Sequence, residues 1–287
     1  MKRNWRSLMF VPANEPKRWA KAHTRGADCI IIDLEDSIQP ADKAAARPMC
    51  AEAVRALVGN KATVAVRVNN HPDLLGDDLA AAVTPGLSAI VLPKAESAVD
   101  LVTVDEEVSR LEAAQAMPHG AVAVIAVIES PAAFERIREI ADGPRLAGLC
   151  VGSEDFALSL GRPPTPMVLD PVCQQVAYVA SARGLMGLGM ACGIGNYTDL
   201  KTWENDARRA YAMGLTGALS IHPNQIPALH AAFGASEAEL ADARAIVAAW
   251  ATRSGGVVAH NGRMLDLPIV ERARRLLADS GEAPGKA

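Results

Sequence analysis

The 287-residue sequence has no surplus of positive charge, since 29 Lys and Arg residues stand against 33 Asp and Glu residues. Proteins that bind nucleic acid usually carry a basic face, so the net charge of −4 argues against that class. No apolar run approaches the roughly 20 residues of a membrane-spanning helix. The first residues, MKRNWRSLMFVPAN, follow their basic side chains with only a short apolar stretch, unlike a signal peptide. We therefore expect a cytoplasmic protein.

Paired cysteines and a complete glycine fingerprint are also missing. None of the five cysteines forms a CxxC pair, and three of them lie inside apolar runs. This pattern favours reduced thiols in the core, with a catalytic cysteine as the less favoured alternative. The stretch CGIGNY at 192–197 lacks the third glycine of a dinucleotide-binding loop.

Short apolar runs rich in Val, Ile and Leu alternate with segments whose apolar residues lie three and four positions apart. The runs indicate strands buried on both faces, and the segments between them indicate amphipathic helices. This alternation predicts an α/β fold, a (β/α)8 TIM barrel over residues 1–234, with a doubly wound open sheet as the competitor. The runs cover residues 7–13, 29–35, 63–69, 89–94, 121–129, 146–153, 187–193 and 217–223.

Residues 235–287 follow the last run and read as a C-terminal extension. A helical pattern covers residues 235–253, and Asn261-Gly262 is a strong signal for a two-residue hairpin. A last helix is expected from Leu267, with Pro268 in its first turn. We expect this helical and hairpin extension to lie outside the barrel and to contact a neighbouring subunit.

Charged side chains gather where the apolar runs end. The second run passes from CIII into three carboxylates, Asp33, Glu35 and Asp36. Other runs end in Arg67, Lys94, Glu129, the SED at 153–155 and His222. The active site of a TIM barrel lies at the carboxyl ends of its strands, so these residues are expected at one mouth. Carboxylates opposite an arginine suggest Mg²⁺, although helix caps or rim salt bridges would account for them equally well.

Many of these residues lie in motifs that resemble the citrate lyase β-subunit-like family of the HpcH/HpaI aldolase superfamily. The motifs include RSLMFVPANEPKR, DCIIIDLEDSIQPADKAAAR, VLPKAES, VIES, GSEDFALSLG, GLTGALSIHPNQI and NGRMLDLP, in the family's order. The resemblance covers nearly the whole chain. It implies a Mg²⁺-dependent barrel enzyme that makes or cleaves carbon–carbon bonds in hydroxyacyl thioesters, such as malyl-, citramalyl- or citryl-CoA, releasing an acyl-CoA and a keto acid.

The resemblance also implies residue roles. Glu129 and Asp155 match the family's metal ligands, and Arg67 matches a catalytic arginine that contacts the substrate near its reacting carbonyl. Asp266 in MLDLP matches an aspartate that relatives place over a neighbouring subunit's active site, where it could exchange a proton with the enolate carbon. The family is usually trimeric or hexameric, so a homo-oligomer is expected.

Four further residues are predicted to support this chemistry. The backbone N–H groups around Gly152 and Ser153 are expected to hold the substrate carboxylate at a helix N-terminus. Glu35 and Asp36 are expected to support the site through hydrogen bonds or bound water.

Several alternatives stay open in the sequence. Asp266 also suits an N-cap before Leu267-Pro268, Lys94 invites a Schiff-base interpretation, and His222 reads as structural or near the thioester. The segment between Gly161 and Gly184 lacks the arginine-rich stretch of many relatives, which leaves the acyl group undetermined. The competing functions are a thioesterase, the β subunit of a lyase with an acyl carrier protein partner, a pyruvate-dependent aldolase, and a binding protein without activity.

Overall fold

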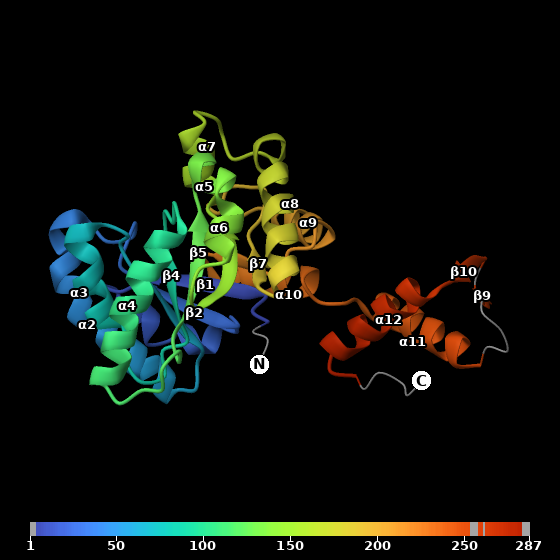
Figure 1. The fold of residues 1–287 in the computed structure, drawn as a ribbon, viewed down its shortest axis with the longest axis horizontal. Coiled ribbons are helices and arrows are strands. Elements are labelled where there is room, and N and C mark those ends of the chain that lie inside the picture. The colour runs from blue at the N-terminus through green and yellow to red at the C-terminus, as the bar shows by residue number, and fades with distance from the viewer. Residues whose placement is uncertain (1–3, 253–257, 261, 283–287) are drawn as a thin grey trace. The chain divides into compact units, whose positions relative to one another are not determined.

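The computed structural model describes residues 4–252, 258–260 and 262–282, and contacts within the chain divide it into two compact units. The first unit ends at Phe233 and the second begins at Gly234. Figure 1 shows the strands of the first unit with helices packed around them. Among the described helices, none combines the length and the apolar character that crossing a membrane would require.

The strands of the first unit form one parallel sheet that closes on itself. They are adjacent in chain order from β1 to β7, and β8 pairs with β1. The ends of the sheet meet at a parallel bridge between Leu188 and Gly217. The predicted (β/α)8 TIM barrel is therefore confirmed, and the open sheet is excluded. The strands are β1 (Ser7–Pro12), β2 (Cys29–Asp33), β3 (Val64–Arg67), β4 (Ala89–Leu92), β5 (Ala123–Ile128), β6 (Leu146–Val151), β7 (Met186–Leu188) and β8 (Ala218–Ser220).

Side-chain alternation along the strands separates two cores. In β2, Cys29 and Ile31 pack inside the barrel, whereas the alternate isoleucines pack in the layer between strands and helices. A period of two places Asp33 on the inner face, so this buried run ends in a carboxylate inside the mouth. The same parity brings Arg67 at the end of β3 and Glu129 directly after β5 to the inner face.

Helices begin close to the strand ends because the sequence places capping residues there. Ser130 starts α5 by accepting a hydrogen bond from the Ala133 N–H at 3.0 Å, and prolines occupy the first turns of α3, α5 and α8. The helices of the first unit are α1 (Pro16–Trp19), α2 (Lys43–Gly59), α3 (Pro72–Ala82), α4 (Ala98–Ala114), α5 (Pro131–Glu135), α6 (Ile137–Ala141), α7 (Ser153–Ser159), α8 (Pro166–Arg183), α9 (Leu200–Ala212) and α10 (Ile226–Ala232). Three 3₁₀ turns add η1 (Ala22–Arg25), η2 (Pro40–Asp42) and η3 (Pro223–Gln225).

The second unit has its own small core. Helices α11 (Glu237–Ala251) and α12 (Leu267–Asp279) pack through apolar side chains that include Trp250 and Val270. Strands β9 (Val258–His260) and β10 (Arg263–Leu265) pair antiparallel. The predicted turn falls between them; Gly262 has a φ of 73°, and Asn261 lies outside the described residues.

Candidate active site

A cavity of about 890 Å³ opens at the carboxyl ends of the strands. Its lining includes Phe10 from β1, Arg67 from β3, Glu129 after β5 and Asp155 from α7. Most of the residues that the sequence predicted at the mouth therefore meet at one cavity, whereas Glu35 and Lys94 lie behind its lining. This arrangement matches the location of active sites in TIM barrels.

Arg67 is clamped by the carboxylate that ends β2. Its Nε donates to Asp33 Oδ1 at 2.7 Å, and its Nη2 donates to Asp33 Oδ2 at 2.8 Å. The Phe10 ring lies beneath, with its centroid 4.5 Å from the guanidinium carbon. This bidentate geometry fixes the plane of the guanidinium, so Arg67 presents its charge in one orientation.

Each member of this buried pair keeps the other charged. Burial alone would raise the pKa of Asp33, but the hydrogen bonds and positive charge of Arg67 hold that pKa below its usual value. Burial likewise opposes the charge on Arg67, and the contact with Asp33 raises the pKa of Arg67 above its usual value. The sequence analysis placed Asp33 at the mouth without giving it a role, although the parity of β2 already indicated an inward-facing carboxylate.

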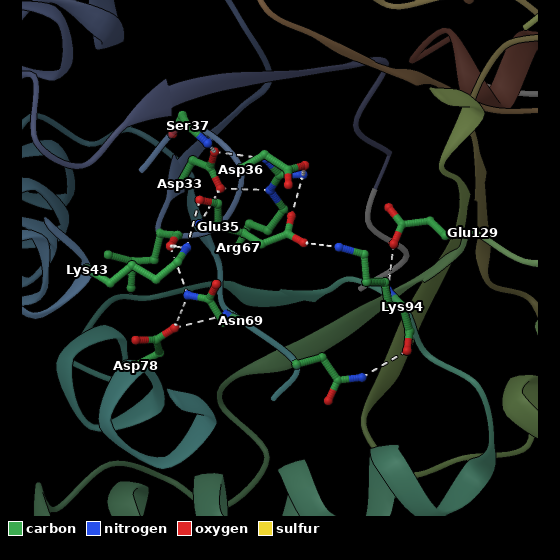
Figure 2. Close-up of polar contacts among 12 residues, drawn as sticks. Asp33, Glu35, Asp36, Ser37, Lys43, Arg67, Asn69, Asp78, Lys94 and Glu129 are labelled. Atoms are coloured by element: carbon green, nitrogen blue, oxygen red, sulfur yellow. Dashed lines mark hydrogen bonds and ion pairs between the residues drawn. The ribbon is translucent and has the colours of Figure 1, made fainter. Parts of the chain in front are cut away.

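Glu35 and Asp36 complete the anionic surroundings of Arg67 (Figure 2). Arg67 Nη1 lies 2.8 Å from Glu35 Oε2 and donates to Asp36 Oδ2 at 3.1 Å. Glu35 is buried, and this burial raises its pKa against the opposing effect of Arg67. Asp36 has 57% of its side chain exposed, so it is the easier of the two to displace. These contacts suit the supporting role that was predicted for both residues.

Hydrogen bonds from two side chains fix the backbone of the loop that carries these two carboxylates. Lys43 Nζ donates to the backbone oxygens of Leu34 and Glu35 at 3.1 and 3.0 Å. Asn69 Nδ2 also donates to the Leu34 oxygen, at 2.8 Å. The backbone around Glu35 is therefore fixed by side chains from α2 and from the segment after β3.

Glu129 is a buried carboxylate with an unusual pKa. Burial, followed by the charges of Glu35 and Asp155, raises the pKa of Glu129 to about 8. Its Oε2 accepts a hydrogen bond from the Lys94 backbone N–H at 2.7 Å. A proton or a cation at Glu129 would relieve the electrostatic cost of this arrangement.

Gly152 gives Glu129 its space. A Cβ added at Gly152 would lie 2.2 Å from Glu129 Cγ and 2.6 Å from Glu129 Oε1, far inside normal contact distance. The Gly152 N–H donates to the Ile128 oxygen at 3.0 Å within the barrel. This N–H is therefore engaged within the barrel, so of the two predicted contacts with a substrate carboxylate only the one from Ser153, at the start of α7, stays a prediction.

Asp155 lies in the first turn of α7, half-buried at the cavity wall. Within the described residues, no group of three or more His, Cys, Asp and Glu side chains is arranged to hold a metal ion. The two predicted ligands, Glu129 and Asp155, both line the cavity. Two carboxylates suffice for Mg²⁺, which keeps several waters and completes its shell with substrate oxygens. The residues present therefore fit this ion.

Lys94 does not have the environment of a Schiff-base lysine. Its Nζ donates to Glu35 Oε1 at 2.9 Å, and this hydrogen bond raises the pKa of Lys94. A lysine that forms imines needs a lowered pKa so that its amine is unprotonated. The ammonium ion of Lys94 is instead an ion-pair partner of Glu35 (Figure 2).

His222 and Asp266 both act as helix caps. His222 Nδ1 accepts a hydrogen bond from the Asn224 N–H at 3.1 Å, and its ring stacks on Tyr197 with centroids 5.0 Å apart. Asp266 belongs to the second unit, where its Oδ1 accepts from the Ile269 N–H at 3.2 Å at the start of α12. The N-cap interpretation of Asp266 is therefore seen directly, and a second role is compatible with it because the side chain is exposed.

Three basic residues at the cavity edge were not singled out by the sequence analysis. Lys17 and Arg18 from α1 and Arg25 from η1 line the cavity and are exposed to solvent. The only sequence signal was the segment NEPKR in the first motif. Their position suits a ligand with phosphate groups.

The cysteines do not contribute a nucleophile. All five are free thiols, and four of them are buried. Burial raises the pKa of Cys173 to about 12 and also raises the pKa of Cys192, the cysteine that lines the cavity. Such thiols stay protonated at neutral pH, as expected for structural cysteines.

Comparison with known proteins agrees with this geometry. The chain is 35% identical to a citrate lyase subunit beta-like protein of Deinococcus radiodurans, covering 95% of this chain and 96% of that protein. It is 30% identical to an L-malyl-CoA/beta-methylmalyl-CoA lyase of Cereibacter sphaeroides, covering 93% and 92%. The CitE protein of Mycobacterium tuberculosis, crystallised with magnesium, acetoacetate and coenzyme A, superposes with a TM-score of 0.80 at 30% identity, covering 98% of this chain and 100% of that one. The HpcH/HpaI aldolase/citrate lyase family profile matches residues 6–223, and the chain belongs to this family.

Proposed function

We propose that the chain is a Mg²⁺-dependent carbon–carbon lyase. Its substrate class is a hydroxyacyl-CoA thioester such as malyl-, citramalyl- or citryl-CoA, which it cleaves to an acyl-CoA and a keto acid. The observation that carries this proposal is the pair Glu129 and Asp155 on the wall of the cavity that Arg67 also lines. The lyase names of both curated relatives support the reaction class.

Glu129 and Asp155 would hold the metal ion. When bound, Mg²⁺ supplies Lewis acidity toward the hydroxyl and carboxylate oxygens of the substrate and lowers the pKa of the hydroxyl. The backbone at Ser153, where α7 begins beside Asp155, is proposed to bind the substrate carboxylate.

Arg67 would stabilise the negative charge that develops in the reaction. The hydroxyl proton passes to solvent, the O–H electron pair forms the carbonyl group of the keto acid, and the electrons of the broken carbon–carbon bond form the enolate of the acyl thioester. One preorganised donor at such an oxyanion contributes about 3 kcal/mol. Asp33 occupies Nε and Nη2, so we propose that Nη1 meets the enolate oxygen after the exposed Asp36 carboxylate is displaced.

The second unit would supply the proton for the enolate carbon. Asp266 is exposed and lies between two exposed apolar side chains, Met264 and Leu267. Such a surface suits contact with another protein surface. We propose that this unit contacts a neighbouring subunit of a homotrimer or hexamer and presents Asp266 to that subunit's cavity. The free cysteines further support a cytoplasmic location.

Coenzyme A is the proposed carrier of the acyl group. The cavity volume of about 890 Å³ leaves room for an acyl group and the end of a pantetheine arm. Lys17, Arg18 and Arg25 place positive charge where phosphates would lie. The second candidate is the β subunit of a lyase that acts on an acyl carrier protein, and the words "subunit beta-like" in the name of the Deinococcus relative support the subunit part of this candidate.

Mass spectrometry of the purified protein with Mg²⁺ and a panel of malyl-, citramalyl-, citryl- and methylmalyl-CoA tests the proposal. We expect a shorter acyl-CoA and a keto acid from at least one member. Free CoA with an intact hydroxy acid would instead identify a thioesterase. Turnover only after an acyl carrier protein is added would establish the second candidate, and turnover of pyruvate without any thioester would establish an aldolase.

A further inference from the structure

Lys94 has a backbone conformation that non-glycine residues rarely adopt. It follows β4 and Pro93 with a φ of 49°, in the left-handed region. Three hydrogen bonds hold it there (Figure 2). Its N–H donates to Glu129 Oε2 at 2.7 Å, its carbonyl oxygen accepts from Asn70 Nδ2 at 2.9 Å, and its Nζ donates to Glu35 Oε1 at 2.9 Å.

The other described non-glycine residues with a positive φ either end a helix or lie away from the mouth of the barrel. Lys61 and Ala116 directly follow the C-caps of α2 and α4, where left-handed residues commonly end a helix. Arg145 precedes β6, at the opposite end of the barrel from the mouth. Lys94 lies at the carboxyl end of a strand, beside the proposed metal ligand. Strained residues gather at functional sites, so its conformation calls for a function.

The chain is fixed on both sides of Lys94. β4 pairs with β3 up to Val91 and with β5 up to Leu92, and the Ala95 N–H donates to the Val127 oxygen at 3.3 Å. Between these anchors, the left-handed φ allows the chain to leave the strand while the Lys94 N–H faces Glu129. A residue that resists this φ would have to turn the peptide and weaken the bond to Glu129.

We propose that Lys94 is a positioning residue that acts through its backbone. The left-handed turn at this position aims the N–H at Glu129 Oε2 and so fixes the Glu129 carboxylate for the metal ion. The ammonium group has a separate contact, with Glu35. This inference rests on the proposed function, because it concerns the ligand geometry of the same metal site.

Mn²⁺ affinity, measured in variants at position 94, distinguishes a role of the Lys94 backbone from a role of its side chain. Mn²⁺ is titrated into each purified variant, and free Mn²⁺ is measured by electron paramagnetic resonance. Lys94→Gly and Lys94→Asn tolerate a positive φ, and Lys94→Met keeps an unbranched side chain without charge. All three should bind Mn²⁺ within about 2-fold of the wild type, because Gly and Asn accept the left-handed φ and Met has the same unbranched Cβ as Lys, so the N–H keeps its direction toward Glu129. Lys94→Val is β-branched and disfavours this φ, so it should weaken binding by about 10-fold or more, in the range for residues that orient a ligand.

Glu129→Gln is the reference variant for the site itself. If Lys94→Val binds Mn²⁺ like the wild type while Glu129→Gln has lost binding, the backbone role is wrong and the proposed function stands. If Lys94→Gly is as weak as Lys94→Val, the side chain carries the effect and the proposal is also overturned. Normal Mn²⁺ binding by Glu129→Gln would overturn the metal site, and with it the inference.

A second variant covers the case in which Lys94→Val does not fold, as judged by circular dichroism. Asn70→Ala leaves residue 94 unchanged but removes the hydrogen bond to its carbonyl oxygen. Asn70 is half-buried, and within the described part of the chain its side chain makes no hydrogen bond with Glu129. It should weaken Mn²⁺ binding a few-fold without changing the fold. Wild-type affinity in Asn70→Ala would contradict the proposal.

Discussion

Replacing Gly152 with alanine should disable the metal site while the barrel stays folded. The backbone of Gly152 has a φ of −89°, which alanine adopts readily, so the effect comes from space alone. The new Cβ would lie 2.2 Å from Glu129 Cγ and 2.8 Å from Glu129 Cδ, whereas ordinary contacts begin at 3.4 Å. Since Cγ is near the backbone of Glu129, the whole carboxylate must move by roughly 1 Å or more. A misplacement of about 1 Å can reduce turnover about 100-fold.

The stability change should be smaller than the functional change. Overpacking of this kind destabilises a protein by about 1–3 kcal/mol, which urea unfolding can measure. Gly195→Ala is the matched control, because a Cβ at Gly195 meets nothing within 4 Å and its loop also borders the cavity through Ile194 and Tyr197. Turnover of malyl- or citryl-CoA and Mn²⁺ affinity are compared in both variants. If Gly152→Ala has the turnover and the Mn²⁺ affinity of the wild type, Glu129 is not a metal ligand whose position depends on the absence of a side chain at residue 152.

Further variants test the other charged groups. Asp33→Asn should lower the free energy of unfolding at pH 7 by up to about 3 kcal/mol, because Arg67 loses its charged partner. Because the pKa of Asp33 in the folded protein lies below its usual value of 3.8, the Asp33 carboxylate stabilises the fold at pH values above 3.8, and this contribution is lost as the pH falls through the pKa of the folded state. Urea unfolding at pH 3 should therefore show a smaller stability difference between Asp33→Asn and the wild type than at pH 7. An equal difference at both pH values would argue against the ion pair. Asp155→Ala should abolish metal-dependent turnover at an unchanged melting temperature, and unchanged turnover would remove it from the metal site. Asn caps helices as well as Asp does, so Asp266→Asn should lower kcat with little change in KM if it transfers a proton; wild-type kinetics would leave it as a cap only.

Much of the mouth could be predicted from the sequence because parallel strands present their carboxyl ends together. Eight apolar runs predicted the barrel, and the polar residues at or just after their ends include Arg67, Glu129 and Asp155, which line one cavity. The period of two along β2 was sufficient to place Asp33 inside. Local pattern carries this information because alternation and strand ends depend on a few consecutive residues.

Other features depend on distant parts of the chain, and no local pattern reports them. The need for glycine at position 152 arises from the side chain of Glu129, which comes from the previous strand. The φ of Lys94 is sustained by partners at positions 35, 70 and 129. The motif VLPKAES marked the lysine but could not distinguish a role for its side chain from a role for its backbone. Tertiary contacts decide these cases.

The run of carboxylates that begins at the end of β2 is explained by the charges that surround it. Two cations and five carboxylates meet at the mouth: Arg67 and Lys94, with Asp33, Glu35, Asp36, Glu129 and Asp155. The first three carboxylates form ion pairs with the two cations at 2.7 to 3.1 Å. In the described part of the chain, no such ion pair joins Glu129 or Asp155, and burial with neighbouring negative charge leaves Glu129 with a pKa of about 8. Asp33, Glu35 and Asp36 therefore hold protein cations in place, whereas Glu129 and Asp155 face a deficit of positive charge that a divalent cation would remove.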